Sequence, residues 1–123
     1  MMSTPAEERL VTLIAESARG PKREGLFALW LVVRAAEGLL PPAPVSVKNH
    51  RRRLQALETR LGSLALPAPL KRALAAARQH LETATPNAAA LVLSQLTAPA
   101  RDVLGAEAAD AVTVAARTAR LHL

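Results

Sequence analysis

The chain has 123 residues, of which half are hydrophobic and only 2% aromatic, and its net charge is +6. It contains no cysteine, which excludes disulfides, thiolate metal sites and cysteine nucleophiles. This length is enough to bury a core without disulfides or bound metal. Because aromatic residues are so few, the core must be aliphatic. We therefore expect residues 1–123 to form a single domain.

The first two helices are predicted from a capping motif and from hydrophobic spacing. Thr4-Pro5-Ala6-Glu7 has the form of a capping box with proline at the first helical position, and Gly20-Pro21 should end that helix. A second helix should run from about Lys22 to Leu39 and be apolar on every side, so we expect it to lie buried at the centre. The first helix should bury one side, made of Leu10, Leu13, Ile14 and Ala18.

Prolines separate the next two predicted helices from their neighbours. Pro41–Pro44 predicts a stiff extended connector. A third helix should run from about Ser46, its N-cap, to Leu61, with Gly62 as the stop. A fourth should run from about Leu70 to Thr83. The expected apolar side of the third helix consists of Val47, His50, Leu54, Leu57, Leu61 and Leu64.

The last part of the chain leaves two interpretations open. A fifth helix should run from Thr85-Pro86 to about Leu96, because Pro99 should start a new region. That region is either one helix or a short turn followed by a longer helix, broken near Gly105. No stretch alternates with β-branched residues as a strand would. The sequence thus predicts an all-α fold: a single compact bundle of five to six short helices, with proline-rich connectors and a buried central second helix.

The positive charge is concentrated in residues 46–80, which hold eight basic residues and one acidic residue, Glu58, whereas the rest of the chain sums to −1. Glu58 has no basic residue three or four positions away, so it should pair with none on its own helix. Arg78 can pair with Glu82. We call the eight basic residues the basic set: Lys48, Arg51, Arg52, Arg53, Arg60, Lys71, Arg72 and Arg78.

The basic set is the candidate binding surface. Lysine and arginine grip phosphates without reading sequence, so duplex nucleic acid is one possible partner and an acidic protein is another. Single-strand binding is disfavoured because the segment has no aromatic residue for stacking. The connector from Gly62 to Pro69 is too long for a helix-turn-helix motif. A merely solvated face is the alternative interpretation.

Catalytic motifs are missing from the sequence. The histidines form no metal-binding pair, the serines lie in no nucleophile-elbow context, and the glycines form no phosphate-cradling loop. His50 and His80 lie on or beside apolar stripes, which favours a structural role for both over phosphotransfer at His50. Arg34 and Glu37 should form a structural ion pair in the second helix. We predict no catalytic residue, metal or cofactor, so an enzyme is the least supported class.

The predicted function is that of a small non-catalytic helical interaction or regulatory protein that self-associates, most simply as a homodimer. The alanine-rich last region favours close helix packing between chains. The alternative is a duplex nucleic-acid-binding protein that uses the basic set. The N-terminal "MMSTPAEERL" is acidic, and the longest apolar run, Leu26–Val33, is far shorter than the ~20 residues of a membrane span. We therefore expect no membrane span and a cytoplasmic location.

Overall fold

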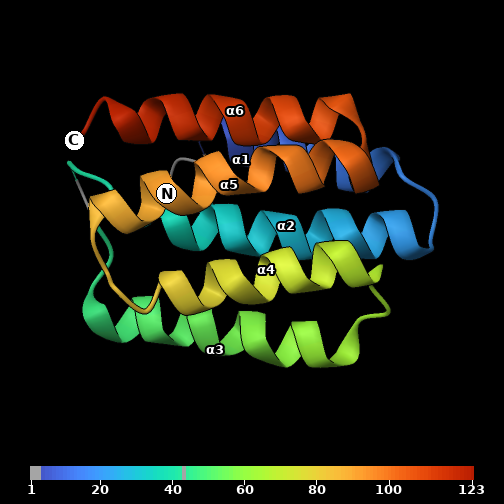
Figure 1. Ribbon diagram of the computed structural model, residues 1–123, viewed down its shortest axis with the longest axis horizontal. Coiled ribbons are helices and arrows are strands. Elements are labelled where there is room, and N and C mark those ends of the chain that lie inside the picture. The colour runs from blue at the N-terminus through green and yellow to red at the C-terminus, as the bar shows by residue number, and fades with distance from the viewer. Residues whose placement is uncertain (1–3, 43) are drawn as a thin grey trace.

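Six α-helices make up the regular structure of the residues that the structure describes. The computed structural model describes residues 4–42 and 44–123, and within them no strand occurs. This confirms the prediction of an all-α bundle (Figure 1). The helices are α1 (Pro5–Glu16), α2 (Pro21–Glu37), α3 (Val47–Ser63), α4 (Ala68–His80), α5 (Pro86–Leu104) and α6 (Ala106–Arg120).

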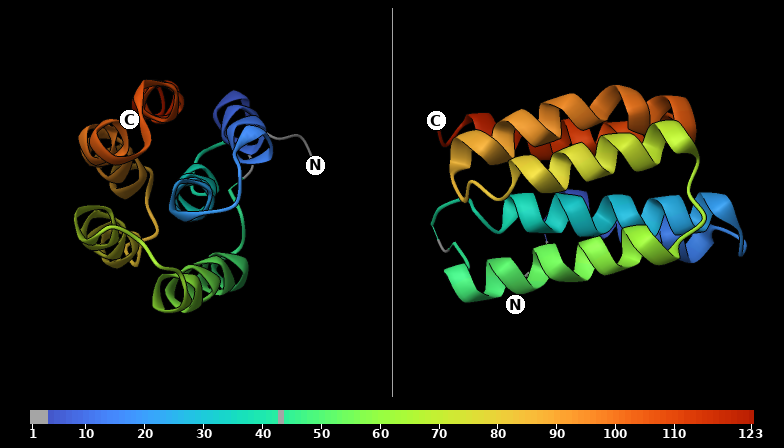
Figure 2. Two further views of the ribbon diagram at one scale, coloured as in Figure 1. Left: turned by 90° about the vertical axis from the view of Figure 1, so that its right-hand side faces the viewer. Right: turned by 60° about the horizontal axis from the view of Figure 1, so that its bottom comes forward.

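Helix α2 lies at the centre of the bundle, as predicted. It packs against each of the other five helices, which surround it in the end-on view of Figure 2. Leu29, Val32 and Val33 are fully buried at this centre. A Cβ atom on Gly25 would lie 2.7 Å from the side chain of Leu104, so the missing side chain allows α5 to approach α2 closely.

The ring of helices around α2 is incomplete on one side. Among the described helices, α1 and α3 both pack against α2 but not against each other. Figure 2 shows the two helices on either side of α2 with no helix between them. The side of α2 that faces this interval is therefore only half-buried, and it carries Phe27, Trp30 and Arg34.

The predicted starts of α1, α3 and α5 are confirmed in detail, whereas α4 spans Ala68–His80 rather than the predicted Leu70 to Thr83. Thr4 accepts a hydrogen bond from the N–H of Glu7 (3.2 Å), and the Glu7 carboxylate accepts one from the N–H of Thr4 (3.4 Å), which completes the capping box. Ser46 and Thr85 cap α3 and α5 through their side chains. Each cap satisfies a backbone donor that the helix itself leaves unpaired.

Several predicted helix ends were wrong by a few residues. Helix α1 ends at Glu16, so Ala18 lies beyond it and is exposed. Gly20, with φ of +147°, is instead the N-cap of α2. Gly62 did not stop α3, which continues to Ser63, because a glycine can adopt ordinary helical angles as readily as left-handed ones. Val47 is 62% exposed rather than buried, because it begins α3 at the end of the bundle.

The largest difference from the predicted helices concerns Pro99. Helix α5 does not end at Leu96 but runs through Pro99 to Leu104. A proline in a helix interior removes one backbone hydrogen bond and crowds the carbonyl four residues earlier. Leu96, Ala100 and Leu104 on either side of it are buried, and this packing holds the helix continuous. The predicted break at Gly105 is confirmed, since its φ of +101° separates α5 from α6.

Two short parts of the predictions lie outside the described residues. These are Met1–Ser3 in the acidic N-terminal stretch and Ala43 in the proline connector. In the described chain, none of the six helices combines the length and the apolar character that crossing a bilayer requires.

Candidate functional site

Six residues of the basic set remain exposed on α3 and α4, which pack side by side and run antiparallel at one edge of the bundle (Figure 1). None of the six forms a salt bridge with any residue in 4–42 or 44–123. Because the helices are antiparallel, the cations of the first α3 turns lie at one end of this pair and those of the first α4 turn at the other. The six are Lys48, Arg51, Arg52, Arg60, Lys71 and Arg72.

Arg78 differs from these six because acidic residues neutralise it. Its guanidinium contacts Glu58 of α3 at 3.0 Å and Glu82 at 2.9 Å. The predicted pairing with Glu82 is confirmed, and Glu58 finds its basic partner on the neighbouring helix rather than on its own. Arg78 therefore ties α3 to α4 and contributes little positive charge to the surface.

Arg53 is not among the exposed residues of the basic set either, because its side chain turns towards α2. Its Nη1 donates to the backbone carbonyl of Arg34 at 3.2 Å. Burial, and then the positive charge of Arg34, lower the pKa of its guanidinium from the ordinary value. A Cβ atom on Gly38 would lie 2.5 Å from this Nη1, so the glycine leaves the space that the guanidinium occupies.

The two aromatic residues of the chain lie on the half-buried side of α2, and an arginine covers each. The rings of Phe27 and Trp30 meet edge to face, with centroids 5.8 Å apart. The guanidinium of Arg60, from α3, lies 5.4 Å from the Phe27 ring centre, and that of Arg34 lies 5.5 Å from the Trp30 ring centre. Both distances are within the range of cation–π attraction.

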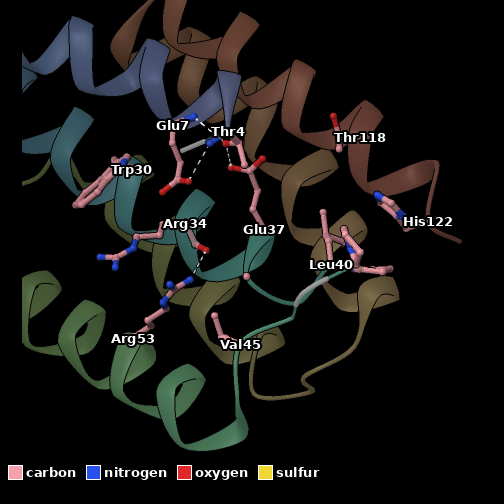
Figure 3. A pocket seen from close by; sticks show the side chains of 13 residues that line it. Thr4, Glu7, Trp30, Arg34, Glu37, Leu40, Val45, Arg53, Thr118 and His122 are labelled. Carbon is pink, nitrogen blue, oxygen red and sulfur yellow. Dashed lines mark hydrogen bonds between the residues drawn. The ribbon is translucent and has the colours of Figure 1, made fainter. Parts of the chain in front are cut away.

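A pocket of about 670 Å³ opens at one end of this side of α2 (Figure 3). The start of α1, the second half of α2, the connector to α3, residue 53 of α3 and the end of α6 all contribute to its wall. Its lining combines charged side chains with an apolar floor: Thr4, Glu7, Trp30, Arg34, Glu37, Gly38, Leu40, Pro41, Pro42, Val45, Arg53, Thr118 and His122.

The ion pair predicted between Arg34 and Glu37 does not form. Glu37 instead accepts a hydrogen bond from the hydroxyl of Thr4 at 2.7 Å, while Arg34 turns to Trp30. The prediction considered only the spacing of the two residues on one helix, whereas α1 brings a competing hydroxyl to Glu37 and α2 itself offers an aromatic ring to Arg34. The acidic and basic residues of the pocket consequently make no salt bridge with one another in the described chain.

Glu37 is the carboxyl group most altered by its surroundings. Burial raises its pKa from 4.5 to about 7, and the nearby Glu7 adds to the increase, while the hydrogen bond from Thr4 opposes it. At neutral pH this carboxyl is therefore only about half ionised. The pocket then carries two guanidinium groups against less than two full carboxylate charges.

The histidines occupy unlike positions. His50 is 3% exposed, and its Nε2 lies 2.8 Å from the carbonyl of Leu81. A carbonyl can only accept, so Nε2 carries the proton, and this bond joins the first turns of α3 to the end of α4. The inward orientation expected for His50 is confirmed. His80, expected beside an apolar stripe, is exposed.

The pocket was missed by sequence reasoning, although one signal pointed to it. Arg34 and Glu37 are charged residues in the most apolar helix, and such residues need a partner or a polar cavity. The sequence could not show that Arg53 would join them from α3, because that depends on the crossing of two helices.

No protein-family model, curated protein or solved structure matches this chain.

Proposed function

We propose that the protein is a non-catalytic binding protein that holds duplex nucleic acid against the exposed cations of α3 and α4. The observation that carries this proposal is the set of six exposed lysines and arginines, none of which is paired with an acid among the described residues. A merely solvated face would be expected to intersperse acids among its bases, yet Glu58 is the only acid in residues 46–80.

The length of the helix pair suits a duplex. Helix α3 has 17 residues, which corresponds to about 25 Å at 1.5 Å per residue. Measured along the duplex axis, successive phosphates of one strand are about 3.4 Å apart, so cations at both ends of the pair can contact a duplex over about seven base-pair steps. The exposed residues include no aromatic platform, which suits contact with the backbone rather than stacking on bases.

Binding to a duplex DNA of arbitrary sequence, followed by fluorescence anisotropy across a salt series, tests the proposal. Affinity should fall linearly with salt on logarithmic axes. The variant Lys48→Ala/Arg51→Ala/Arg52→Ala should reduce the slope by about 3 if all three residues contact phosphates, since each contact contributes about 0.9. All three are exposed on α3, and alanine favours the helix, so the fold should persist.

The matched control removes the same charge elsewhere. Arg9→Ala/Arg101→Ala/Arg117→Ala deletes three exposed arginines from α1, α5 and α6. Its salt slope should stay close to that of the parent. If the control weakens binding as much as the α3 variant does, net charge rather than this surface is responsible. No binding at low salt would refute the proposal outright.

A further inference from the structure

The pocket beside Trp30 is a second feature of the molecule, separate from the exposed cations. We propose that it binds a small organic anion with an apolar body, such as a medium-chain carboxylate, which Arg34 and Arg53 hold by its head group. The volume of about 670 Å³ lies in the range of about 300–1,000 Å³ that is usual for small-molecule sites. The proposal does not depend on nucleic-acid binding.

The two guanidinium groups supply the anion-binding end. Arg34 and Arg53 come from different helices, both are half-buried, and both line the pocket. They lie close enough for Arg34 to lower the pKa of Arg53, yet neither has an acidic partner among the described residues. Two like charges brought together by the fold are stabilised by an anion between them, and guanidinium groups suit a carboxylate in particular.

The acids in the same wall do not fill that role. Glu7 completes the cap of α1, and Glu37 accepts from the Thr4 hydroxyl, so both carboxyl groups are directed towards Thr4 (Figure 3). The raised pKa of Glu37 also weakens its repulsion of an incoming anion near neutral pH. A ligand anion therefore meets a locally positive surface.

The apolar part of the wall accommodates the body of the ligand. Leu40, Pro41, Pro42 and Val45, from the end of α2 and the connector, line the pocket together with the ring of Trp30. An aliphatic chain placed there removes apolar surface from water, which favours binding. The combination of paired arginines and an apolar floor selects an amphipathic anion over an inorganic one.

Titration with octanoate tests the site, with 1-octanol as the uncharged analogue. Trp30 is the single tryptophan of the chain, so its fluorescence reports on this pocket alone. Isothermal titration calorimetry gives the affinity independently of the contact between Arg34 and Trp30. We expect saturable binding of octanoate, and binding at least tenfold weaker for 1-octanol, because one charge-assisted hydrogen bond corresponds to roughly a tenfold change.

Three variants locate the binding. Arg34→Gln and Arg53→Gln should each weaken octanoate binding about tenfold. Gly38→Ala keeps both charges but places a methyl group where the Arg53 guanidinium lies, so it should weaken binding similarly. Since Gly38 has a φ of −65°, alanine fits the backbone there. Arg101→Gln, which removes an exposed charge from α5, is the matched control and should bind as the parent does.

Thermal unfolding of each variant, followed by circular dichroism, separates a lost site from a lost fold. The proposal is overturned if octanoate shows no saturable binding at millimolar concentration, if 1-octanol binds equally well, or if folded Arg34→Gln and Gly38→Ala bind octanoate as tightly as Arg101→Gln. None of these outcomes bears on binding to duplex DNA, which the α3 variant tests separately.

Discussion

Thr4 connects the beginning of α1 with the end of α2 through a single hydroxyl. It accepts from the N–H of Glu7 and donates to the carboxyl group of Glu37. The first role is local and follows from the Thr-Pro-Ala-Glu sequence. The second joins residues 33 positions apart and exists only because α1 packs against α2. It leaves Glu37 half-buried and without a salt bridge to any cation among the described residues.

Replacing Glu37 by glutamine should change how stability depends on pH. Because the pKa of this carboxyl is raised to about 7, the folded state binds a proton more tightly than the unfolded state does. The free energy of unfolding therefore falls as the pH rises from about 4.5 to 7, by at most about 3 kcal/mol. Glu37→Gln removes that loss, while its amide oxygen can still accept from Thr4. Urea unfolding at pH 5 and pH 8 should show a variant that is more stable than the parent at pH 8.

Other charged groups near Glu37 remain in both proteins, so the difference between parent and variant isolates this carboxyl. Glu7 faces it from α1, Arg34 lies on the same helix, Arg53 comes from α3, and His122 follows α6. Glu16→Gln, at the exposed end of α1, is the control and should keep the pH dependence of the parent. Identical curves for parent and Glu37→Gln would contradict the assignment.

Helix α5 shows how tertiary packing overrides a local breaking signal. Pro99 has no backbone N–H, so it predicts the end of the helix. The chain nevertheless stays helical for five residues beyond it, to Leu104. The buried side of α5 continues across the proline, because Leu96 and Ala100 pack on either side of it. The lost hydrogen bond would be to the carbonyl of Gln95, which is exposed and so can bond to water.

Pro99→Ala should therefore stabilise the protein. Alanine restores a backbone donor and relieves the crowding in the helix interior, for a gain of about 1–3 kcal/mol in urea unfolding. The control is Pro86→Ala: Pro86 occupies the first turn of the same helix, where no intrahelical hydrogen bond is lost, so its effect should be small. An equal effect of both substitutions, or a loss of stability in Pro99→Ala, would show that α5 needs the proline for its packing.

The bundle is asymmetric in charge and in exposed apolar surface. Helices α3 and α4 carry six exposed cations with Glu58 as the single acid of residues 46–80, whereas the exposed cations of α1, α5 and α6 lie among acids such as Glu8, Asp102 and Glu107. Three of the large exposed apolar side chains lie on α1, α5 and α6, which pack together on the other side of α2, and a further one, Val47, lies on α3 (Figure 2). Val11 of α1, Leu91 of α5 and Val114 of α6 are 48%, 47% and 42% exposed. Exposed apolar side chains favour contact between copies of a chain. We therefore predict that the self-association expected from the sequence involves α1, α5 and α6.

Light scattering should thus report a dimer at micromolar concentration. Leu91→Glu places a charge at one of these exposed apolar positions without touching the core, and it should shift the equilibrium towards monomer. Val47→Glu, which alters an exposed apolar residue at the start of α3, is the control and should leave the dimer intact. A single species of 13.0 kDa at all concentrations would rule out the dimer.

Much of the fold follows from short-range information in the chain. The capping residues Thr4, Ser46 and Thr85 each act on a backbone donor three residues away, so their effect can be recognised without knowing the fold. The apolar coverage of α2 likewise requires burial wherever that helix is placed. Hydrophobic spacing on α3 separated the inward His50 from the outward Arg52, because both positions follow from helix geometry alone.

The pairing of charges, by contrast, depends on which helices meet. Arg78 of α4 pairs with Glu58 of α3. Glu37 accepts a hydrogen bond from Thr4 instead of pairing with Arg34 as predicted. Arg53 of α3 donates to the backbone of α2. None of these contacts lies within one helix, and their energies are small beside the packing that brings the helices together. The pocket at Trp30 also depends on which helices meet. It forms because α1 and α3 leave one side of α2 uncovered, and only the packing of the bundle determines which side that is.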